Sequence, residues 1–517
     1  MYDVLIVGAG PVGLTAGLLF QRMGINAIVV DRRSTMNRHP KARNLKIRGV
    51  EIFRALGIEA EIRQEEFPKE ARRIMWLESF CGDEIANISV DNEQAKRYSP
   101  CETAGLSQAS LEGILRDSIK GDQVSIQYET EFIDFVEDND SIVATLKRNG
   151  ETFQIRAKYL LAADGARSPT RKLLGIPVLG REEMGAFVSI YFKANPYPIA
   201  PYRPSAMYFM LGDAAFGRFV QSVNCKDKWL MGIKLIPEME RDPTDFHREY
   251  CLQFIRETFE IPDLNIEILD IEFWNMCVQI AQNFRKGRAF LAGDAAHLLT
   301  PAGGFGLQTG IEDVHNLCWK LASVIRGQLP EGILDTYHDE RFPTVQSNIE
   351  WSRNNQKGYV AIVAAGRSGE RKNLQELISA QSPVLNSIGQ DIGFSYKSDL
   401  VISDGTKVVP NTSTEYTPNA RPGSRAPHLW LQGPSGLIST LDLFIDSFVL
   451  LTGSEGKSWQ KKLQSMHPSL SFRCVSIGEK GDYNDINNDF YELYGIERGG
   501  AVLVRPDGHV YWRSKAP

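Results

Sequence analysis

The fold is decided by the stretch Val4–Gly13, which reads VLIVGAGPVG. Its four leading apolar residues predict a buried strand, and the apolar spacing over Leu14–Met23 predicts a helix. In such a strand–turn–helix unit the first glycine permits a tight turn and the second lets the backbone approach a pyrophosphate. The third lets the helix pack on the strand. The stretch therefore predicts a dinucleotide-binding fold.

A second strand supports this interpretation of the glycine-rich turn. The run Ala27–Val30 is apolar and ends at Asp31, where this fold places an acid that accepts a ribose hydroxyl. A lone glycine-rich turn often only packs a helix on a strand. The coincidence of strand, helix, second strand and acid argues against that alternative, but it does not distinguish NAD from FAD.

The composition is that of an ordinary globular chain of several domains. A chain of 517 residues is too long for a single hydrophobic core, so several domains are expected. Its 43% hydrophobic and 24% charged residues exclude a disordered chain. A net charge of -6 provides no excess of positive charge to attract the phosphates of a nucleic acid, so we expect no nucleic-acid partner. Because no basic leader precedes Val4 and no apolar run is long enough to cross a bilayer, we predict a cytoplasmic protein without a membrane span.

The cysteines and histidines indicate no metal or disulfide chemistry. The seven cysteines are scattered without a CxxC pair, which predicts a reducing compartment and no zinc site. The eight histidines are dispersed, and His297 is expected to order a loop rather than bind a metal. The stretch Thr452–Ser458 nearly matches a phosphate-binding loop, but Leu451 stands where the first glycine is required.

Two further landmarks pair a strand with an acidic turn. The apolar run Tyr159–Ala163 leads into Asp164-Gly165, and a later run, Arg288–Ala292, leads into Gly293-Asp294. A strand that ends at Asp294 can direct a carboxylate at a ribityl hydroxyl. The glycines that follow, and the helix predicted over residues 309–325, can bring backbone N–H groups to a pyrimidine ring or a phosphate.

In this order and at this separation, the three motifs resemble the FAD-dependent aromatic hydroxylases of the para-hydroxybenzoate hydroxylase and phenol hydroxylase type. The resemblance covers residues 1–345, including Asp335–Pro343, which is similar to a helix-ending signature of the family. The segments Pro40–Arg43 and Glu51–Ile58 look most like hydroxylases of aromatic polyketides. The implied fold is α/β, with a Rossmann-like FAD domain, a β-sheet substrate domain and a thioredoxin-like C-terminal domain.

The resemblance also implies domain boundaries. The FAD domain would comprise 1–75, 104–178 and 274–395, the substrate domain 76–103 and 179–273, and the thioredoxin-like domain 396–517. Thioredoxin chemistry needs two thiols and this last region holds only Cys474, so we expect the tail to be structural. Within it, Phe444–Leu451 is strand-like, and Pro506–Gly508 predicts a hairpin turn between two strands.

Site residues follow from the resemblance by motif position. FAD would be held by Gly8, Gly10, Gly13, Asp31, Lys41, Arg43, Gln108, Asp164 and Asp294, and by the backbone at Gly304, Gly306 and Leu307. Pro301 would be the catalytic position, because its carbonyl matches the one beside the flavin and the reacting substrate. Lys41 and Arg43 share a single assignment. For Gln108 the alternative is an ordinary polar residue before a helix, and Thr300 and Gln308 depart from the family's commoner proline and asparagine.

The electron donor is implied to be NADPH or NADH. Arg167 and Arg171 match positions implicated in donor binding, with a solvated basic turn as the alternative. Because no second GxGxxG occurs in the sequence, the donor is expected to dock transiently on the FAD domain.

The implied activity is FAD-dependent monooxygenation with O2 as co-substrate, hydroxylating a phenolic or polycyclic aromatic molecule through a flavin C4a-hydroperoxide. An aromatic cluster suits such a small aromatic substrate, although sheet core is the alternative for each member: Tyr208, Phe209, Met210, Phe216 and Phe219. A Baeyer–Villiger or epoxidising outcome on the same flavin stays open, as does a flavin- or drug-binding protein without turnover. The oligomeric state also stays open, with a homodimer as one alternative.

Overall fold

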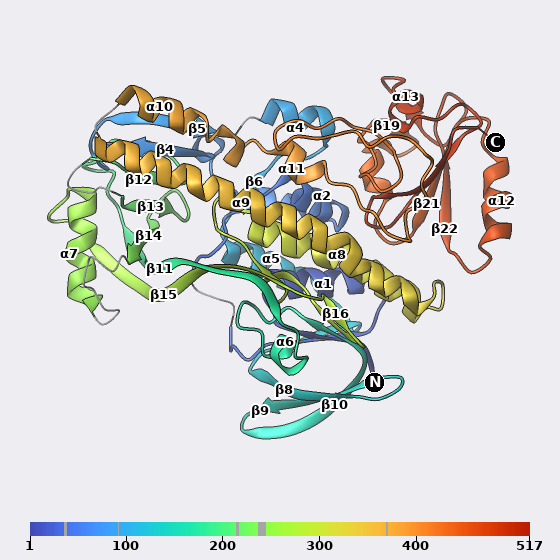
Figure 1. Cartoon of the computed structure of the whole chain (residues 1–517), viewed down its shortest axis with the longest axis horizontal. Coiled ribbons are helices and arrows are strands. Elements are labelled where there is room, and N and C mark those ends of the chain that lie inside the picture. Colours follow the sequence, from blue (N-terminus) through green and yellow to red (C-terminus); the bar gives the residue numbers. More distant parts are fainter. Residues whose placement is uncertain (36–38, 91, 213–216, 236–244, 369–370, 517) are drawn as a thin grey trace.

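The computed structural model describes all residues except 36–38, 91, 213–216, 236–244, 369–370 and 517. Figure 1 shows an antiparallel sheet with its helix at one end and the C-terminal region, coloured red, at the other. A mainly parallel sheet lies between and below them, and one long helix runs across the molecule from the antiparallel sheet toward the C-terminal region (Figure 1). The mixed α/β architecture agrees with the predicted fold class.

The parallel sheet carries the N-terminal motif. Its parallel strands run in the order β17 (Ala289–Leu291), β10 (Glu151–Ala162), β1 (Tyr2–Val7), β2 (Ala27–Val30) and β7 (Val124–Gln127). Because parallel strands end at one edge, the ends of β1, β2, β10 and β17 bring the predicted acidic turns together.

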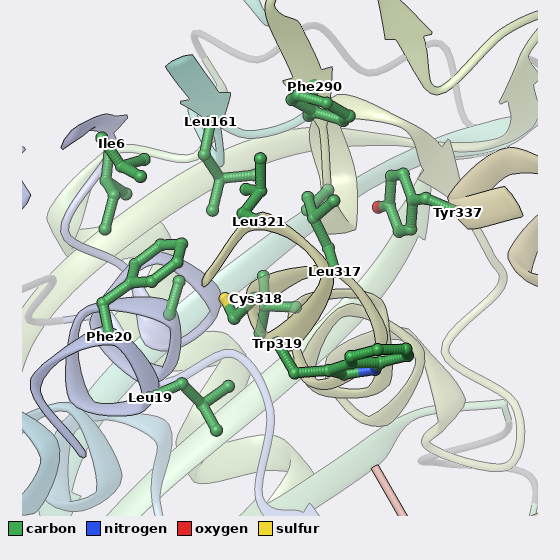
Figure 2. Close-up of a cluster of buried hydrophobic side chains, with 14 of the residues drawn as sticks. Ile6, Leu19, Phe20, Leu161, Phe290, Leu317, Cys318, Trp319, Leu321 and Tyr337 are labelled. Carbon is green, nitrogen blue, oxygen red and sulfur yellow. The ribbon is translucent and has the colours of Figure 1, made fainter. Parts of the chain in front are cut away.

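Helices α1 (Pro11–Arg22) and α8 (Phe305–Ile325) pack on this sheet, and their apolar side chains form a core with those of the strands. Helix α1 begins three residues before the predicted start, since a proline is favoured at the first helical position. Helix α8 begins four residues earlier than predicted. Figure 2 shows side chains of the strands together with those of α1, α8 and the following helix: Ile6, Leu161, Phe290, Leu19, Phe20, Leu317, Trp319, Leu321 and Tyr337.

The second sheet is mainly antiparallel and unites two separate stretches of chain. Its order is β18 (His297–Leu298), β15 (Ile266–Ala281), β11 (Val178–Ala194), β14 (Lys228–Leu235), β13 (Phe219–Ser222), β12 (Met207–Met210), β4 (Arg73–Leu77) and β5 (Glu84–Ser89). Strand β12 pairs with β4, so the excursion near residues 76–103 joins the same sheet as residues 179–273. Strand β4 begins before residue 76, and β15 continues past residue 273.

The aromatic cluster predicted from sequence is divided between the two faces of this sheet. Tyr208 and Met210 are buried in the core under helix α7 (Arg248–Phe259), as the sheet-core alternative expects. Phe209 belongs to the opposite face, because side chains alternate along a strand. Phe219 packs near Phe209 with ring centroids 5.9 Å apart. Phe216 lies outside the described residues.

The expectation that Asp335–Pro343 ends a helix is wrong. A 3₁₀ turn (Glu331–Asp335) leads directly into α9 (Thr336–Ser368), and Pro343 lies inside that helix. Proline lacks an N–H and removes one hydrogen bond of the helix. The helix is nevertheless held around it by the buried side chains of Tyr337 and Arg341.

The C-terminal region has the thioredoxin arrangement. Its sheet runs β22 (Phe472–Ser476), β21 (Phe448–Thr452), β24 (Ala501–Val504) and β25 (Val510–Ser514), with β21 and β22 parallel around α12 (Ser458–Met466). Strands β24 and β25 form the hairpin predicted at Pro506–Gly508. The predicted strand from Phe444 begins only at Phe448, and a 3₁₀ turn, Thr440–Leu443, precedes it in the chain.

A buried cluster of charges joins the C-terminal region to α8 and α9. The Glu340 carboxylate of α9 accepts hydrogen bonds from Nζ of Lys320 at 2.8 Å and from Nη1 of Arg505 at 2.6 Å. Asp507 accepts one from Nε1 of Trp319 at 3.1 Å and pairs with Arg505. All five side chains are almost fully buried. We refer to these residues as the Glu340 cluster.

The remaining elements connect these regions. The helices are α2 (Ile47–Ala55), α3 (Glu59–Gln64), α4 (Asn92–Tyr98), α5 (Gln108–Ser118), α6 (Pro169–Leu173), α10 (Arg371–Ser379), α11 (Ile388–Ile392) and α13 (Phe490–Tyr494). The strands are β3 (Asn44–Leu45), β6 (Ala104–Gly105), β8 (Thr130–Glu137), β9 (Ile142–Arg148), β16 (Arg285–Lys286), β19 (Trp430–Gly433), β20 (Gly436–Ser439) and β23 (Asn484–Asp485). Among the helices of the described ranges, none combines the length and apolar character needed to cross a membrane.

Candidate active site

In the glycine-rich turn, Gly10 has free space beside its Cα, whereas Gly8 and Gly13 are tightly packed. A Cβ added at Gly8 would lie 2.3 Å from the carbonyl oxygen of Ala163, and one added at Gly13 would lie 1.9 Å from that of Gly8. At Gly10 an added Cβ would meet nothing within 4 Å. Gly10 also caps α1 without a side-chain hydrogen bond. The backbone here therefore faces free space at a helix N-terminus, as an anion site requires.

Asp31 lies beside this turn at the end of β2. Its Oδ2 accepts the Ala9 N–H at 2.8 Å, and Arg33 donates from Nε to Oδ1 at 3.0 Å and from Nη2 to Oδ2 at 2.8 Å. Burial alone would raise the pKa of Asp31, but these hydrogen bonds outweigh it and hold the pKa below its usual value. Sequence analysis did not identify Arg33, although a basic residue two positions after the acid was the available signal.

Lys41 and Arg43 lie in different surroundings, although they share one sequence assignment. Lys41 is exposed, and its charge is close enough to lower the pKa of Asp294. Arg43 is buried and donates from Nη1 to the carbonyl oxygens of Ala206 at 2.7 Å and Ser222 at 2.6 Å. Desolvation lowers the pKa of Arg43 to about 10. Only Lys41 therefore faces the cluster of acidic turns.

Gln108 begins α5 and fixes the backbone between these two residues. Its backbone N–H donates to the Ala42 carbonyl at 2.9 Å, and its Oε1 accepts the Ala42 N–H at 3.2 Å. Its Nε2 donates to Glu112 at 2.8 Å. The side chain thus positions the Lys41 segment.

The Asp164 turn contains a buried polar atom that is free to bind a ligand. Oδ2 of Asp164 accepts the Thr170 N–H at 3.0 Å, whereas Oδ1 is buried and has no hydrogen-bond partner within the described part of the chain. Arg171 donates from Nη1 to the Ala295 carbonyl at 2.6 Å and thereby joins this turn to the Asp294 turn. Arg167 is exposed. Of the two arginines matched to the donor, only Arg167 faces solvent.

The Asp294 turn is held in place by hydrogen bonds from its neighbours to Asp313 of α8. Oδ2 of Asp313 accepts the Gly293 N–H at 3.0 Å and lies 2.6 Å from Nε2 of His297. Nε of Arg341 donates to Oδ1 of Asp313 at 2.9 Å. His297 therefore orders the loop, as expected from sequence. Asp313 and Arg341 were not identified, and the available signal was two charged residues on otherwise apolar helical faces.

Asp294 itself lies in the short 3₁₀ turn Gly293–Ala295. Its side chain is exposed to solvent, yet the surrounding protein raises the pKa of its carboxyl, an effect that His297 and Lys41 partly counter. An accessible but desolvated carboxylate is typical of a site that a ligand lines.

The backbone of the loop from Pro301 to Leu307 is covered at Gly303 and open at Gly304 and Gly306. The Pro301 carbonyl accepts the Gly304 N–H at 3.1 Å, and Gly304 caps α8 with a φ of 71°. A Cβ added at Gly303 would lie 2.1 Å from the Trp351 ring, whereas one added at Gly304 or Gly306 would meet nothing within 4 Å. This open side suits the approach of a flat ring to the first turn of α8.

These features fit FAD. The open backbone at Gly10 suits a pyrophosphate, the desolvated Asp294 suits a ribityl hydroxyl, and the open side of Gly304 and Gly306 suits an isoalloxazine ring. The free Oδ1 of Asp164 is a further polar atom available to a ligand.

Comparison with known proteins identifies two matching family models. A model described as an FAD binding domain matches residues 1–352, and a model described as the C-terminal region of aromatic-ring hydroxylases matches residues 419–517. The chain is 33% identical to a putative polyketide hydroxylase of Streptomyces halstedii, over 99% of this chain and 93% of that protein.

Two solved structures resemble the whole chain. The flavin-dependent monooxygenase PieE, in complex with FAD and substrate, is 28% identical with a TM-score of 0.91, covering 100% of this chain and 96% of that one. Aklavinone-11 hydroxylase, in a ternary complex with FAD and aklavinone, is 29% identical with a TM-score of 0.85 at the same coverage.

Proposed function

The chain belongs to the FAD-binding aromatic-ring hydroxylases, and from that membership we propose which residues hold the cofactor and what kind of molecule is hydroxylated. The protein is an FAD-dependent monooxygenase that uses a reduced nicotinamide donor and O2. When bound, FAD activates O2 for insertion of one oxygen atom into the substrate. The protein residues bind and orient the reactants and exclude water.

We propose that FAD lies across the ends of β1, β2, β10 and β17. The pyrophosphate would lie at Gly10 and the α1 N-terminus, between Gly8 and Gly13, with Lys41 as the nearby cation. Asp31 would accept the ribose hydroxyls. The single observation that carries this placement is the open space at Gly10 between two glycines that the fold closes.

The flavin half would extend toward α8. Asp294 would bind the ribityl chain, and the backbone of Gly304, Gly306 and Leu307 would face the isoalloxazine ring. Asp164 would contribute its free oxygen. Gln108 would position the backbone of the Lys41 segment, and Arg43 would hold the carbonyls of Ala206 and Ser222. The carbonyl of Pro301 would remain the catalytic contact beside the ring.

The donor would bind near Arg167, because this side chain is exposed at the Asp164 turn. Arg171 would act by positioning, since it joins the Asp164 and Asp294 turns. NADPH and NADH are both compatible with one exposed arginine.

The substrate we propose is phenolic or polycyclic and aromatic. The face of the second sheet opposite α7 carries a row of aromatic rings, in which Phe209 stacks on Trp76 at 5.6 Å and lies 5.3 Å from Tyr359. At its other end Phe187 stacks on Trp274 at 4.8 Å. The rings of Trp76, Phe209 and Tyr359 belong to a cluster packed against α9 and α10, so the stacked pair Phe187 and Trp274 is the part that suits a flat apolar substrate.

Mass analysis of products formed under labelled dioxygen tests this function. A panel of phenols and anthraquinone-like compounds would be offered with NADPH and with NADH. We expect one labelled oxygen atom to enter an aromatic ring as a hydroxyl group. A ring-expanded ester or an epoxide would indicate the other flavin outcomes, and FAD binding without any product would indicate a binding protein.

We also propose the domain boundaries and surroundings expected from sequence. The pairing of β12 with β4 supports assigning 76–103 and 179–273 to one substrate domain, inserted into an FAD domain of 1–75, 104–178 and 274–395. The region 396–517 forms the third domain. Seven free thiols support a reducing, cytoplasmic location, which cell fractionation would test. Sedimentation would test a homodimer.

A further inference from the structure

A series of buried, hydrogen-bonded side chains leads from the C-terminal region to the Asp294 turn. Nη1 of Arg341 donates to the hydroxyl oxygen of Tyr396 at 3.2 Å, and its Nε donates to Oδ1 of Asp313 at 2.9 Å. Oδ2 of Asp313 accepts the N–H of Gly293, which directly precedes Asp294, at 3.0 Å. Tyr396 is 4% exposed, and Arg341 and Asp313 are fully buried. We refer to Tyr396, Arg341 and Asp313 as the Tyr396 series.

The C-terminal region holds the Tyr396 end of this series. The Tyr396 N–H donates to the carbonyl of Gly423 at 2.9 Å, and the Gly423 N–H donates to the carbonyl of Val510 in β25 at 2.7 Å. The centre of the Tyr396 ring lies 4.2 Å from that of the His509 ring and 5.3 Å from the guanidinium carbon of Arg505. His509 and Arg505 lie in the turn that joins β24 to β25. This hairpin therefore fixes the position of the tyrosine hydroxyl.

Arg341 joins the two elements proposed to face the flavin half of FAD. Its Nη2 donates to the Thr309 carbonyl near the start of α8 at 3.1 Å. Through Asp313 it also holds the Gly293 N–H of the Asp294 turn. One guanidinium thus sets the separation between this turn and the start of α8. The ribityl chain and the isoalloxazine ring are linked covalently, so a site that binds both needs that separation fixed.

The charges of the series favour a single geometry. Burial would raise the pKa of Asp313, but His297 and Arg341 outweigh it and hold the pKa below its usual value. Burial raises the pKa of Tyr396, so its hydroxyl stays neutral and accepts the hydrogen bond from Arg341. Nη2 of Arg341 also donates to Glu312 at 3.1 Å. A buried ion pair that loses a partner leaves an uncompensated charge, so displacement of the guanidinium is costly.

We propose that Tyr396 and Arg341 are positioning residues through which the C-terminal region holds the Asp294 turn in the form that binds the flavin half of FAD. This inference rests on the proposed placement of FAD. The ADP half would lie at Gly10 and Asp31, and among the described residues no hydrogen bond of the Tyr396 series reaches either of them. Loss of the series should therefore weaken binding of the flavin half and spare binding of the ADP half.

FAD and ADP distinguish the two halves of the site. Tyr396→Phe keeps the ring against His509 and removes only the hydroxyl that accepts from Arg341. Titration of the flavin-free protein gives the FAD affinity, and competition with FAD gives the ADP affinity. We expect FAD affinity to fall by about three- to tenfold, because Arg341 loses a partner and Asp313 is held less firmly. ADP affinity should stay within about twofold of the wild type, because the two sites share no partner.

Tyr416→Phe is the matched control for this variant. The Tyr416 hydroxyl lies 3.5 Å from Nη1 of Arg425, so the control also removes a buried hydroxyl beside a buried arginine. Arg425 pairs with Glu51 of α2 and not with Asp313. We expect unchanged FAD and ADP affinities in Tyr416→Phe.

Arg341 provides a second and stronger test. Arg341→Met removes the charge between Asp313 and Glu312 and should lower FAD affinity by more than Tyr396→Phe does. Arg341→Lys keeps the charge and should recover part of the loss, although an ammonium lacks the fork of the guanidinium. Melting temperature identifies a variant that does not fold, in which case Tyr396→Phe decides.

The outcomes separate this inference from the proposed function. Unchanged FAD affinity in Tyr396→Phe would overturn the assignment, and so would an equal loss of FAD and ADP affinity, which indicates a general effect on the fold. A loss of the same size in Tyr416→Phe would have the same meaning. In each of these cases the hydroxylase function stands. A wild-type protein that binds ADP but not FAD would instead contradict the proposed placement of the cofactor, and this inference with it.

Discussion

Gly10 and Gly13 differ in what surrounds them, and this difference separates cofactor binding from folding. The backbone of Gly10 is extended, with φ -80° and ψ -177°, so a valine fits the chain there. We expect Gly10→Val to fold normally but to lose FAD affinity by about 100-fold or more, equivalent to about 3 kcal/mol, because its side chain takes the space of the pyrophosphate. Flavin titration measures the affinity.

Gly13→Val is the matched control for that prediction. Its Cβ would clash with the Gly8 carbonyl, so this variant should have a lowered melting temperature. A Gly10→Val protein that retains stoichiometric FAD would contradict the placement of the pyrophosphate.

Lys41 and Arg43 also separate binding from stability. Lys41→Met removes an exposed charge near Asp294, so we expect FAD affinity to fall by about tenfold with an unchanged melting temperature. Arg43→Met leaves the buried carbonyls of Ala206 and Ser222 without their donor, which should cost about 2–4 kcal/mol of unfolding free energy. Equilibrium denaturation and flavin titration on both variants check the pair. The reverse pattern would make Arg43 the cofactor contact.

At the scale of elements, α8 and α9 are joined by carboxylates whose charge depends on pH. Burial would raise the pKa of Glu340, but Arg505 and Lys320 outweigh it and hold the pKa well below its usual value. A depressed folded pKa means that the stabilisation is complete above the unfolded pKa of about 4.3 and is lost as pH falls below it. We expect the melting temperature to fall steeply in that acidic range.

Glu340→Gln tests the origin of that acid sensitivity. The variant should be less stable at neutral pH by about 3–5 kcal/mol, because it leaves the buried Lys320 and Arg505 undercompensated. Its melting temperature should also vary less with acidification than that of the wild type. Parallel slopes for the two proteins in thermal melts would assign the acid sensitivity to other carboxylates.

Strand β22 carries the single thiol of the C-terminal region. Cys474 is half-buried, and burial raises the pKa of its thiol, so the group is uncharged at neutral pH. We expect Cys474→Ser to leave turnover within about twofold of the wild type, since the side chain serves packing. A folded, FAD-loaded serine variant without turnover would show that the tail has a chemical role.

Sequence patterns predicted local units well and long-range contacts poorly. The β1–α1–β2 unit and the C-terminal hairpin follow from periodicity and turn residues close together in the chain. The separate surroundings of Lys41 and Arg43 do not, because the partners of Arg43 lie more than 160 residues away in sequence. Pro343 shows the same limit, since burial of α9 overrides a proline that normally ends helices.

For the candidate site, the sequence indicated the motifs but not the residues that support them. Glycines and acids at strand ends identify themselves by spacing. Asp313 and Arg341 do not, because their function depends on α8 and α9 meeting beneath the Asp294 turn. Which aromatic residues lie on the face opposite α7 also depended on the register of β12, since a shift by one residue exchanges the two faces of a strand.

At the scale of the whole molecule, the C-terminal domain covers an apolar surface of α8. Trp319 packs edge-on against Phe448 at 5.4 Å, and the tail shares one continuous core with the parallel sheet. We expect a chain of residues 1–395 to aggregate, because it exposes this surface and leaves the charges of α8 and α9 without Arg505. Light scattering of the purified fragment measures the effect.

Arg505→Met in the full chain is the control for that truncation. It removes the ion pair with Glu340 and keeps the apolar cover, so it should be soluble but less stable. A monomeric fragment that binds FAD would contradict a structural role for the tail.

The Glu340 cluster also has a consequence for biosynthesis. Arg505 is separated from Glu340 by 165 positions, and Asp507 from Trp319 by 188. On a ribosome, α8 and α9 emerge well before the residues that neutralise their buried charges. The Glu340 cluster of the nascent chain therefore stays incomplete for many seconds at ordinary elongation rates. Completion of the flavin-bearing core is therefore a late, post-translational event, and interrupted synthesis would yield chains that chaperones and proteases recognise as incomplete.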